Sequence, residues 1–131
     1  MPNFNRDPVV RRYWYSIDWD VETLWGLDLP VSSLSINSLI WHMDVPLWPY
    51  QGQDYSVTPS EVLNAPTKFA VEYNRIQAAD LDFPLEVYFH LNRWMILDGV
   101  HRLAKAPQLG VSEMQVRHVP EDTVRKLDPP I

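Results

Sequence analysis

The chain has no cysteine among its 131 residues. Disulfide bonds and thiolate metal sites are therefore excluded, and this composition is typical of cytoplasmic proteins. No run of about 18 apolar residues, the length that a transmembrane helix needs, occurs in the sequence. The first residues, Met1 to Asp7, lack the charged and apolar regions of a signal peptide. We therefore expect a cytoplasmic protein that does not enter a membrane.

Basic residues are also scarce. Lysine and arginine number 11 against 17 aspartates and glutamates, which gives a net charge of −6. Non-specific binding to duplex DNA depends on a positive surface, so it is not expected here, although a local basic pocket remains possible. The sequence also lacks a Gly-x-Ser-x-Gly elbow, a Walker A loop and a dinucleotide-binding Gly-x-Gly-x-x-Gly, so those enzyme classes have no support.

Glycine occurs four times and proline 12 times, which favours stiff connections over flexible linkers. With 46% hydrophobic residues, the chain has enough apolar material for one compact domain. We expect residues 1–12 to form a loose arm and residues 13–131 to form that domain. Of the six tryptophans, five lie in the first half. They suit a core or a lid, or alternatively an exposed surface that binds a protein partner.

Hydrophobic spacing and capping residues predict short, alternating strands and helices in the first half. The expected elements are a strand over 13–19, a helix over 20–25, a helix over 37–43 with Leu39, Ile40 and Met43 inward, a polar loop over 51–56, a helix after the capping box of Thr58 and Glu61, and a helix opened by Thr67 with Phe69, Ala70, Tyr73 and Ile76 on its apolar face.

In the second half, alternation predicts a strand from Leu85 to Leu91 with its odd-numbered residues on one face. A turn at Asn92 and Arg93 then returns the chain as a hairpin. Pro107 is expected to stop the following helix early, Gly110 closes that segment, and a strand over 113–119 and a helix over 120–127 complete the domain. The order of elements predicts an α+β fold with a small mixed sheet and flanking short helices.

One stretch combines a structural transition with chemically capable side chains. Trp94 to Leu97 has the length of a strand, Asp98-Gly99 breaks it, and residues 100–106 continue at helical spacing. A helix that starts at such a turn presents free N–H groups and a partial positive charge, which suit a phosphate. Two plainer interpretations remain open, in which Asp98 only caps the helix and Arg102 only pairs with a carboxylate.

The residues Leu97 to Ala106, with Asp98-Gly99-Val100-His101-Arg102, resemble the signature motif of the ParB/sulfiredoxin superfamily. The resemblance is strongest over 85–120. Sulfiredoxins carry a catalytic cysteine where this chain has Val100, so their sulfinic-acid reductase chemistry is excluded. Few residues follow the motif helix, so we do not expect the DNA-binding region of segregation ParB proteins. The stand-alone ParB-like domains remain, a group that includes nucleotide binders, ATP-using small-molecule kinases and proposed nucleases.

The resemblance implies that the motif binds a nucleotide, either ATP or another nucleoside triphosphate, together with Mg²⁺. The implied phosphate-binding residues are Gly99, Val100, His101, Arg102, Lys105 and Arg75. Lys105 reaches either a terminal phosphate or solvent. Asp98 and His101 are the catalytic candidates, with Asp98 holding the metal-bound nucleotide or acting as a base. Asp80 is a candidate Mg²⁺ carboxylate, or else the partner of Arg75 in a structural ion pair.

The sequence therefore predicts a nucleotide-binding domain, and the resemblance implies transfer of phosphate from ATP to a small molecule as its activity. The alternative is a non-catalytic adaptor that binds a protein partner through its tryptophan-rich half. A metal-dependent nuclease is a weaker alternative, because the net charge opposes it. His42, His90 and His118 show no metal-ligand spacing and are interpreted as ordinary histidines.

Overall fold

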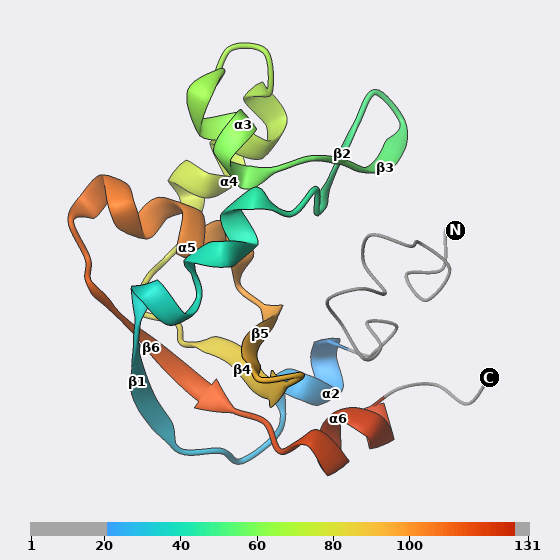
Figure 1. Cartoon of the computed structure of the whole chain (residues 1–131), viewed down its shortest axis with the longest axis vertical. Coiled ribbons are helices and arrows are strands. Elements are labelled where there is room, and N and C mark those ends of the chain that lie inside the picture. Colours follow the sequence, from blue (N-terminus) through green and yellow to red (C-terminus); the bar gives the residue numbers. More distant parts are fainter. Residues whose placement is uncertain (1–20, 128–131) are drawn as a thin grey trace.

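The computed structural model describes residues 21–127, and these form an α+β fold around a four-stranded mixed sheet (Figure 1). The strands of this sheet, in spatial order, are β1 (Val31–Ser35), β6 (Glu113–His118), β4 (Leu85–His90) and β5 (Arg93–Asp98). β6 runs parallel to β4, and the other two pairings are antiparallel. The predicted fold class, α+β with a small mixed sheet, is confirmed.

A hydrophobic cluster lies on each face of the sheet, and successive side chains of β4 point alternately into one cluster and the other. Leu85 and Val87 belong to the larger cluster, which packs under helices α3 (Pro59–Asn64), α4 (Ala70–Ala78) and α5 (Val100–Lys105). Tyr88 belongs to the smaller cluster, which helices α2 (Val21–Trp25) and α6 (Glu121–Leu127) cover. The central strand is thus buried on both sides.

At one end of the molecule, α3 and α4 lie beside a two-stranded ribbon of β2 (Trp48–Tyr50) and β3 (Gln53–Val57) (Figure 1). The predicted capping box starts α3. The Glu61 amide donates to the Thr58 hydroxyl, and the Thr58 amide donates to the Glu61 carboxylate. Two otherwise unpaired amides are satisfied in this way.

The second half follows its prediction closely. The hairpin turn uses Leu91 and Asn92, both with positive φ, one residue earlier than expected. Pro107 does end α5, and the chain continues as a 3-10 helix, η4 (Ala106–Leu109), before Gly110 adopts a left-handed conformation. β6 and α6 form at the predicted positions.

Several local predictions are wrong. Residues 37–43 form two short 3-10 helices, η2 (Ile36–Ser38) and η3 (Ile40–Asp44), rather than one α-helix, and Ser35 provides the cap of η2. Ile40 is exposed, whereas Leu39 and Met43 are buried. The polar loop predicted over 51–56 is largely strand β3, because its backbone pairs with β2 although its side chains are polar.

Two further corrections concern α4 and β4. Helix α4 begins at Ala70 with Phe69 as its N-cap, so Thr67 does not open it. The predicted strand from Leu85 to Leu91 ends at His90 as β4 (Leu85–His90), because Leu91 lies in the turn with positive φ. Phe89 and Leu91 are exposed, whereas Leu85 and Val87 are buried. The predicted arm over 1–12 and strand over 13–19 lie outside the described residues.

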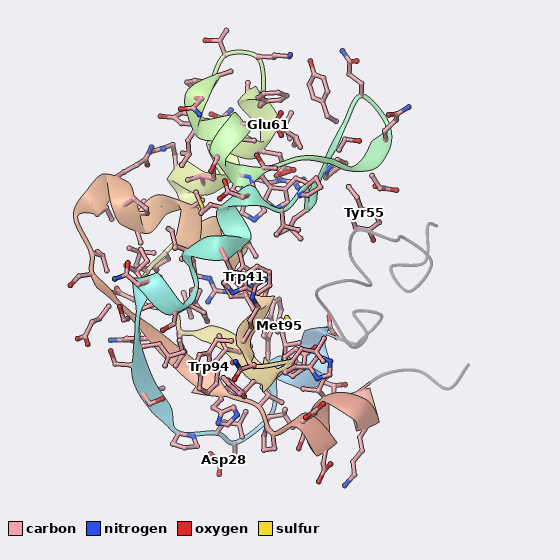
Figure 2. All side chains as sticks on the ribbon, viewed as in Figure 1. Asp28, Trp41, Tyr55, Glu61, Trp94 and Met95 are labelled. Carbon is pink, nitrogen blue, oxygen red and sulfur yellow. The ribbon has the colours of Figure 1, made fainter. Side chains whose placement is uncertain are left out.

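Trp41 and Trp48 have structural roles. The Trp41 indole donates to the Trp94 carbonyl over 3.1 Å and lies under the Arg93 guanidinium, in the middle of the molecule (Figure 2). Trp48 is buried in the larger cluster. Trp25, by contrast, is 56% exposed.

Candidate functional site

The predicted strand, turn and helix are present as β5, Gly99 and α5. Gly99 has φ of 120°, a conformation that other residues rarely adopt. A Cβ atom there would lie 2.4 Å from Leu85 Cδ2 and 3.3 Å from Arg102 Cζ. The glycine is therefore required by the close approach of the protein's own side chains. It lets the Arg102 guanidinium lie directly against the turn.

Asp98 does not cap helix α5, because the N-cap position of that helix is occupied by Gly99. Its Oδ2 instead accepts hydrogen bonds from Trp25 Nε1 at 2.8 Å and from Arg102 at 3.1 Å. The carboxylate thus links α2 to α5. Of the two interpretations left open by the sequence, the carboxylate pairing of Arg102 is confirmed and the capping role of Asp98 is wrong.

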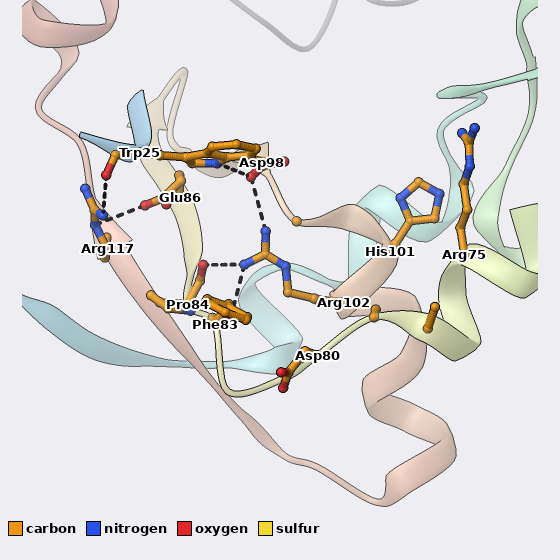
Figure 3. A pocket seen from close by; sticks show the side chains of 13 residues that line it. Trp25, Arg75, Asp80, Phe83, Pro84, Glu86, Asp98, His101, Arg102 and Arg117 are labelled. Carbon is orange, nitrogen blue, oxygen red and sulfur yellow. Dashed lines mark hydrogen bonds and ion pairs between the residues drawn. The ribbon is translucent and has the colours of Figure 1, made fainter. Parts of the chain in front are cut away.

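Arg102 occupies the middle of the site (Figure 3). Besides Asp98, its guanidinium donates to the Phe83 carbonyl at 3.2 Å and to the Pro84 carbonyl at 2.5 Å. These contacts hold the segment before β4 against the helix. Arg102 is consequently a rigid, preorganised cation whose side chain is only 17% exposed.

A second arginine and a second carboxylate lie next to this pair. Glu86 Oε2 and Arg117 Nε are 3.2 Å apart; the Glu86 side chain is buried, and that of Arg117 is mostly buried. These two atoms form an ion pair but not a hydrogen bond. The terminal N–H groups of Arg117 donate instead to the carbonyls of Leu24, Trp25 and Leu27. Burial raises the pKa of Glu86, against the opposing charge of Arg117.

On the other side of Arg102 lies His101 (Figure 3). Its Nε2 is 2.8 Å from Glu72 Oε2, and its ring stacks on Trp48 with centroids 4.3 Å apart. The second oxygen of Glu72 accepts from Arg75 at 3.1 Å. Arg75 therefore pairs with Glu72 and not with Asp80, so the expected Arg75–Asp80 ion pair is wrong. The Asp80 carboxylate accepts from the Asp82 amide in its own turn.

Lys105 has a different position from either of the predicted ones. Its ammonium donates to the carbonyls of Gln77 and Ala79, at 2.8 and 2.7 Å. These are carbonyl groups that the end of helix α4 leaves unpaired, so the lysine caps that helix. Val100 packs partly against the larger hydrophobic cluster. Neither residue lines the cleft described next.

The charged residues surround an open cleft of about 740 Å³ (Figure 3). Its lining includes six of the eight predicted site residues, which are Arg75, Asp80, Asp98, Gly99, His101 and Arg102. The sequence did not indicate its other lining residues, among them Trp25, Phe83, Glu86 and Arg117. Only Glu86 could have been anticipated, because it lies on the polar face of the alternating segment 85–91, which the hairpin brings next to the motif strand. Nothing in the sequence indicated the remaining three.

The fold and the site together define a small α+β protein with an open, charge-balanced cleft at a strand–turn–helix junction. No family model, curated protein or solved structure matches the chain. Among residues 21–127, no helix is long and apolar enough to cross a membrane. Across the same part of the chain, no group of three or more histidine, aspartate or glutamate side chains could hold a metal ion.

Proposed function

We propose that the cleft binds a nucleoside triphosphate as its Mg²⁺ complex, and that the chain is a stand-alone ParB-like domain. The observation that supports this most directly is the convergence of Asp98, His101 and Arg102 on one open cleft. Its volume of about 740 Å³ lies within the range usual for small-molecule sites. The motif residues are thus accessible to a ligand.

The charge balance of the cleft supports binding of the nucleotide as its magnesium complex. Three arginines and three carboxylates line it, so their formal charges cancel. A free nucleoside triphosphate would bring a large negative charge into this balanced site. Its magnesium complex carries two positive charges more, and magnesium needs only one or two protein carboxylates beside the phosphates. Asp80 lines the cleft and pairs with no arginine among residues 21–127, so it is the carboxylate that we assign to this role.

Exposed aromatic rings border the same cleft. Trp25 is 56% exposed and Phe83 is 65% exposed, although large aromatic side chains are usually buried. A nucleobase offers a flat face that stacks on such rings, at a gain of about 1–3 kcal/mol per base. We therefore place the base toward Trp25 and Phe83, and the phosphates toward Arg102, His101 and Arg75.

A bound triphosphate beside a histidine also suits phosphoryl transfer to a small molecule, in which positioning and charge neutralisation do most of the work. The adaptor alternative has less support. Trp41 and Trp48 are engaged inside the described part of the chain, and Trp25 borders the cleft.

Calorimetric titration with ATP, CTP and GTP, each with and without Mg²⁺, tests the proposal. We expect saturable binding with Mg²⁺ and weaker binding without it. Arg75→Ala is the informative variant, because the Arg75 side chain is 62% exposed and contributes little to the core. Circular dichroism checks that the variant is folded. Loss of one charged hydrogen bond to phosphate weakens binding by about tenfold or more.

Lys68→Ala is the matched control, since Lys68 is an exposed cation that does not line the cleft. It should bind as tightly as the wild type. Absence of saturable binding by all three nucleotides at millimolar concentration would contradict the proposed function.

A further inference from the structure

The ring of His101 is fixed by two contacts, one on its face and one at its edge. Its ring lies nearly parallel to the buried Trp48 indole, with an angle of 10° between the two planes. One edge of the ring is fixed by the Glu72 carboxylate, 2.8 Å from Nε2. Glu72 is itself 5% exposed, although glutamate is rarely buried without a purpose or a partner. Three elements, β2, α4 and α5, thus combine to fix one imidazole.

The contacts of Glu72 determine where the imidazole proton lies. One oxygen faces Arg75 and the other faces His101, so the carboxylate accepts hydrogen bonds on both sides. The neutral histidine must then carry its hydrogen on Nε2, which leaves a lone pair on Nδ1. Within the described part of the chain, Nδ1 has no hydrogen-bond partner, and His101 borders the open cleft. A basic nitrogen is therefore available to a ligand.

Asp98, the other predicted catalytic residue, is less suited to accept a proton. Its Oδ2 already accepts hydrogen bonds from Trp25 and Arg102, so this oxygen is occupied by the protein's own donors. The two residues therefore differ in function. Asp98 positions Arg102 and Trp25, whereas His101 keeps an open acceptor site.

We infer that His101 Nδ1 accepts the proton of a hydroxyl group on the molecule that receives the phosphoryl group, with Glu72 and Arg75 positioning the ring. The inference rests on the proposed function, since it requires a bound nucleoside triphosphate. The hydroxyl oxygen forms a bond to the γ-phosphorus, and the bond between that phosphorus and the β–γ bridging oxygen breaks. The electron pair leaves with the nucleoside diphosphate, and the hydroxyl proton moves to Nδ1 and then to solvent.

This chemistry selects an alcohol as the acceptor. A carboxylate acceptor has no proton to donate and would meet the Nδ1 lone pair unfavourably. An alcohol donates its proton to that lone pair and becomes a better nucleophile as it does so. The charged groups around His101 are Glu72 and Arg75 on α4, Asp80 after α4, Asp98 on β5, and Arg102 on its own helix. Of these, Glu72 makes the direct contact.

The first measurement is ¹⁵N–¹H correlation NMR of the imidazole rings in the ligand-free protein. His101 should be the Nε2–H tautomer in the wild type. Glu72→Gln should raise the population of the Nδ1–H tautomer, because an amide can also donate to the ring. A wild-type His101 that carries its proton on Nδ1 would overturn the inference, whatever the nucleotide-binding result.

The second measurement follows turnover of MgATP, MgCTP and MgGTP by ³¹P NMR, with water alone and with glycerol as a hydroxyl probe. The wild type should form nucleoside diphosphate, together with glycerol phosphate when glycerol is present. His101→Asn should lower kcat by about 100-fold or more, the range of general-base catalysis. His118→Asn, at an exposed histidine that does not line the cleft, is the control and should leave the rate unchanged.

The outcomes separate the two hypotheses. If a nucleotide binds but no diphosphate forms with water or glycerol, the inference about His101 fails and the binding proposal stands. The inference also fails if His101→Asn turns over as fast as the wild type. If no nucleotide binds, the proposed function itself fails. Formation of glycerol phosphate that depends on both His101 and Glu72 would support the inference.

Discussion

His42 should make the protein sensitive to mild acid. Its side chain is fully buried, and both ring nitrogens are engaged. Nδ1 lies 2.7 Å from the Leu39 carbonyl, and Nε2 accepts from the Ile96 amide at 3.0 Å. The ring therefore connects η3 to strand β5 in its neutral form. Protonation would place a second hydrogen where the Ile96 amide already donates.

Burial is the main reason that the pKa of His42 falls from 6.5 to about 4. The hydrogen bond to the Leu39 carbonyl raises this pKa, and the nearby charge of Arg93 lowers it further. The unfolded chain binds the proton more readily than the folded one, so stability falls as the pH falls. The full contribution is present above pH 6.5 and is lost progressively toward pH 4. A shift of this size corresponds to about 3 kcal/mol in total, of which about 2 kcal/mol is lost by pH 5.

Urea unfolding at pH 7.5, 6.5, 5.5 and 5.0 measures this loss, with His42→Gln as the comparison. Glutamine can still accept from the Ile96 amide but does not titrate. Between pH 7.5 and 5.0 the wild type should lose about 2 kcal/mol more unfolding free energy than the variant. His118→Gln, at an exposed position, should follow the wild type. Equal losses in wild type and His42→Gln would refute the reasoning, as would a His42 pKa near 6.5 by NMR titration.

Three further predictions concern stability and the cleft. Gly99→Ala should lower the unfolding free energy by about 2–4 kcal/mol in urea, because of its φ of 120° and the clash with Leu85, and should weaken nucleotide binding by displacing Arg102. Thr58→Ala should cost about 1 kcal/mol, measured by thermal unfolding, since it removes one half of the capping box; unchanged stability would contradict that assignment. Lys105→Met should lower the unfolding free energy by about 1–3 kcal/mol, because two carbonyl groups lose their donor. Nucleotide affinity, measured by calorimetry, should stay unchanged. A loss of affinity with intact stability would instead favour a contact between Lys105 and phosphate.

The local sequence determined most of the elements. A capping box, an early proline and a Gly-containing turn each act through the backbone conformation of a few neighbouring residues. The start of α3, the end of α5 and the junction at Gly99 were therefore predictable. Predictions failed where pairing with a distant segment decided the result. Strand β3 is polar, yet its backbone pairs with β2, and no property of residues 51–56 alone indicates that pairing.

The sequence also identified the segment at the centre of the cleft, because the motif residues are consecutive. It could not identify what faces them. Trp25 lies 73 residues from Asp98 along the chain, yet the two share a hydrogen bond. The pairing of β4 with β6 brings Glu86 opposite Arg117, and the packing of α4 on α5 brings Glu72 to His101. Such partners depend on the sheet order and on helix packing, which only the tertiary structure decides. The local sequence thus placed Asp98 to Arg102 at one junction, and the fold specified their partners.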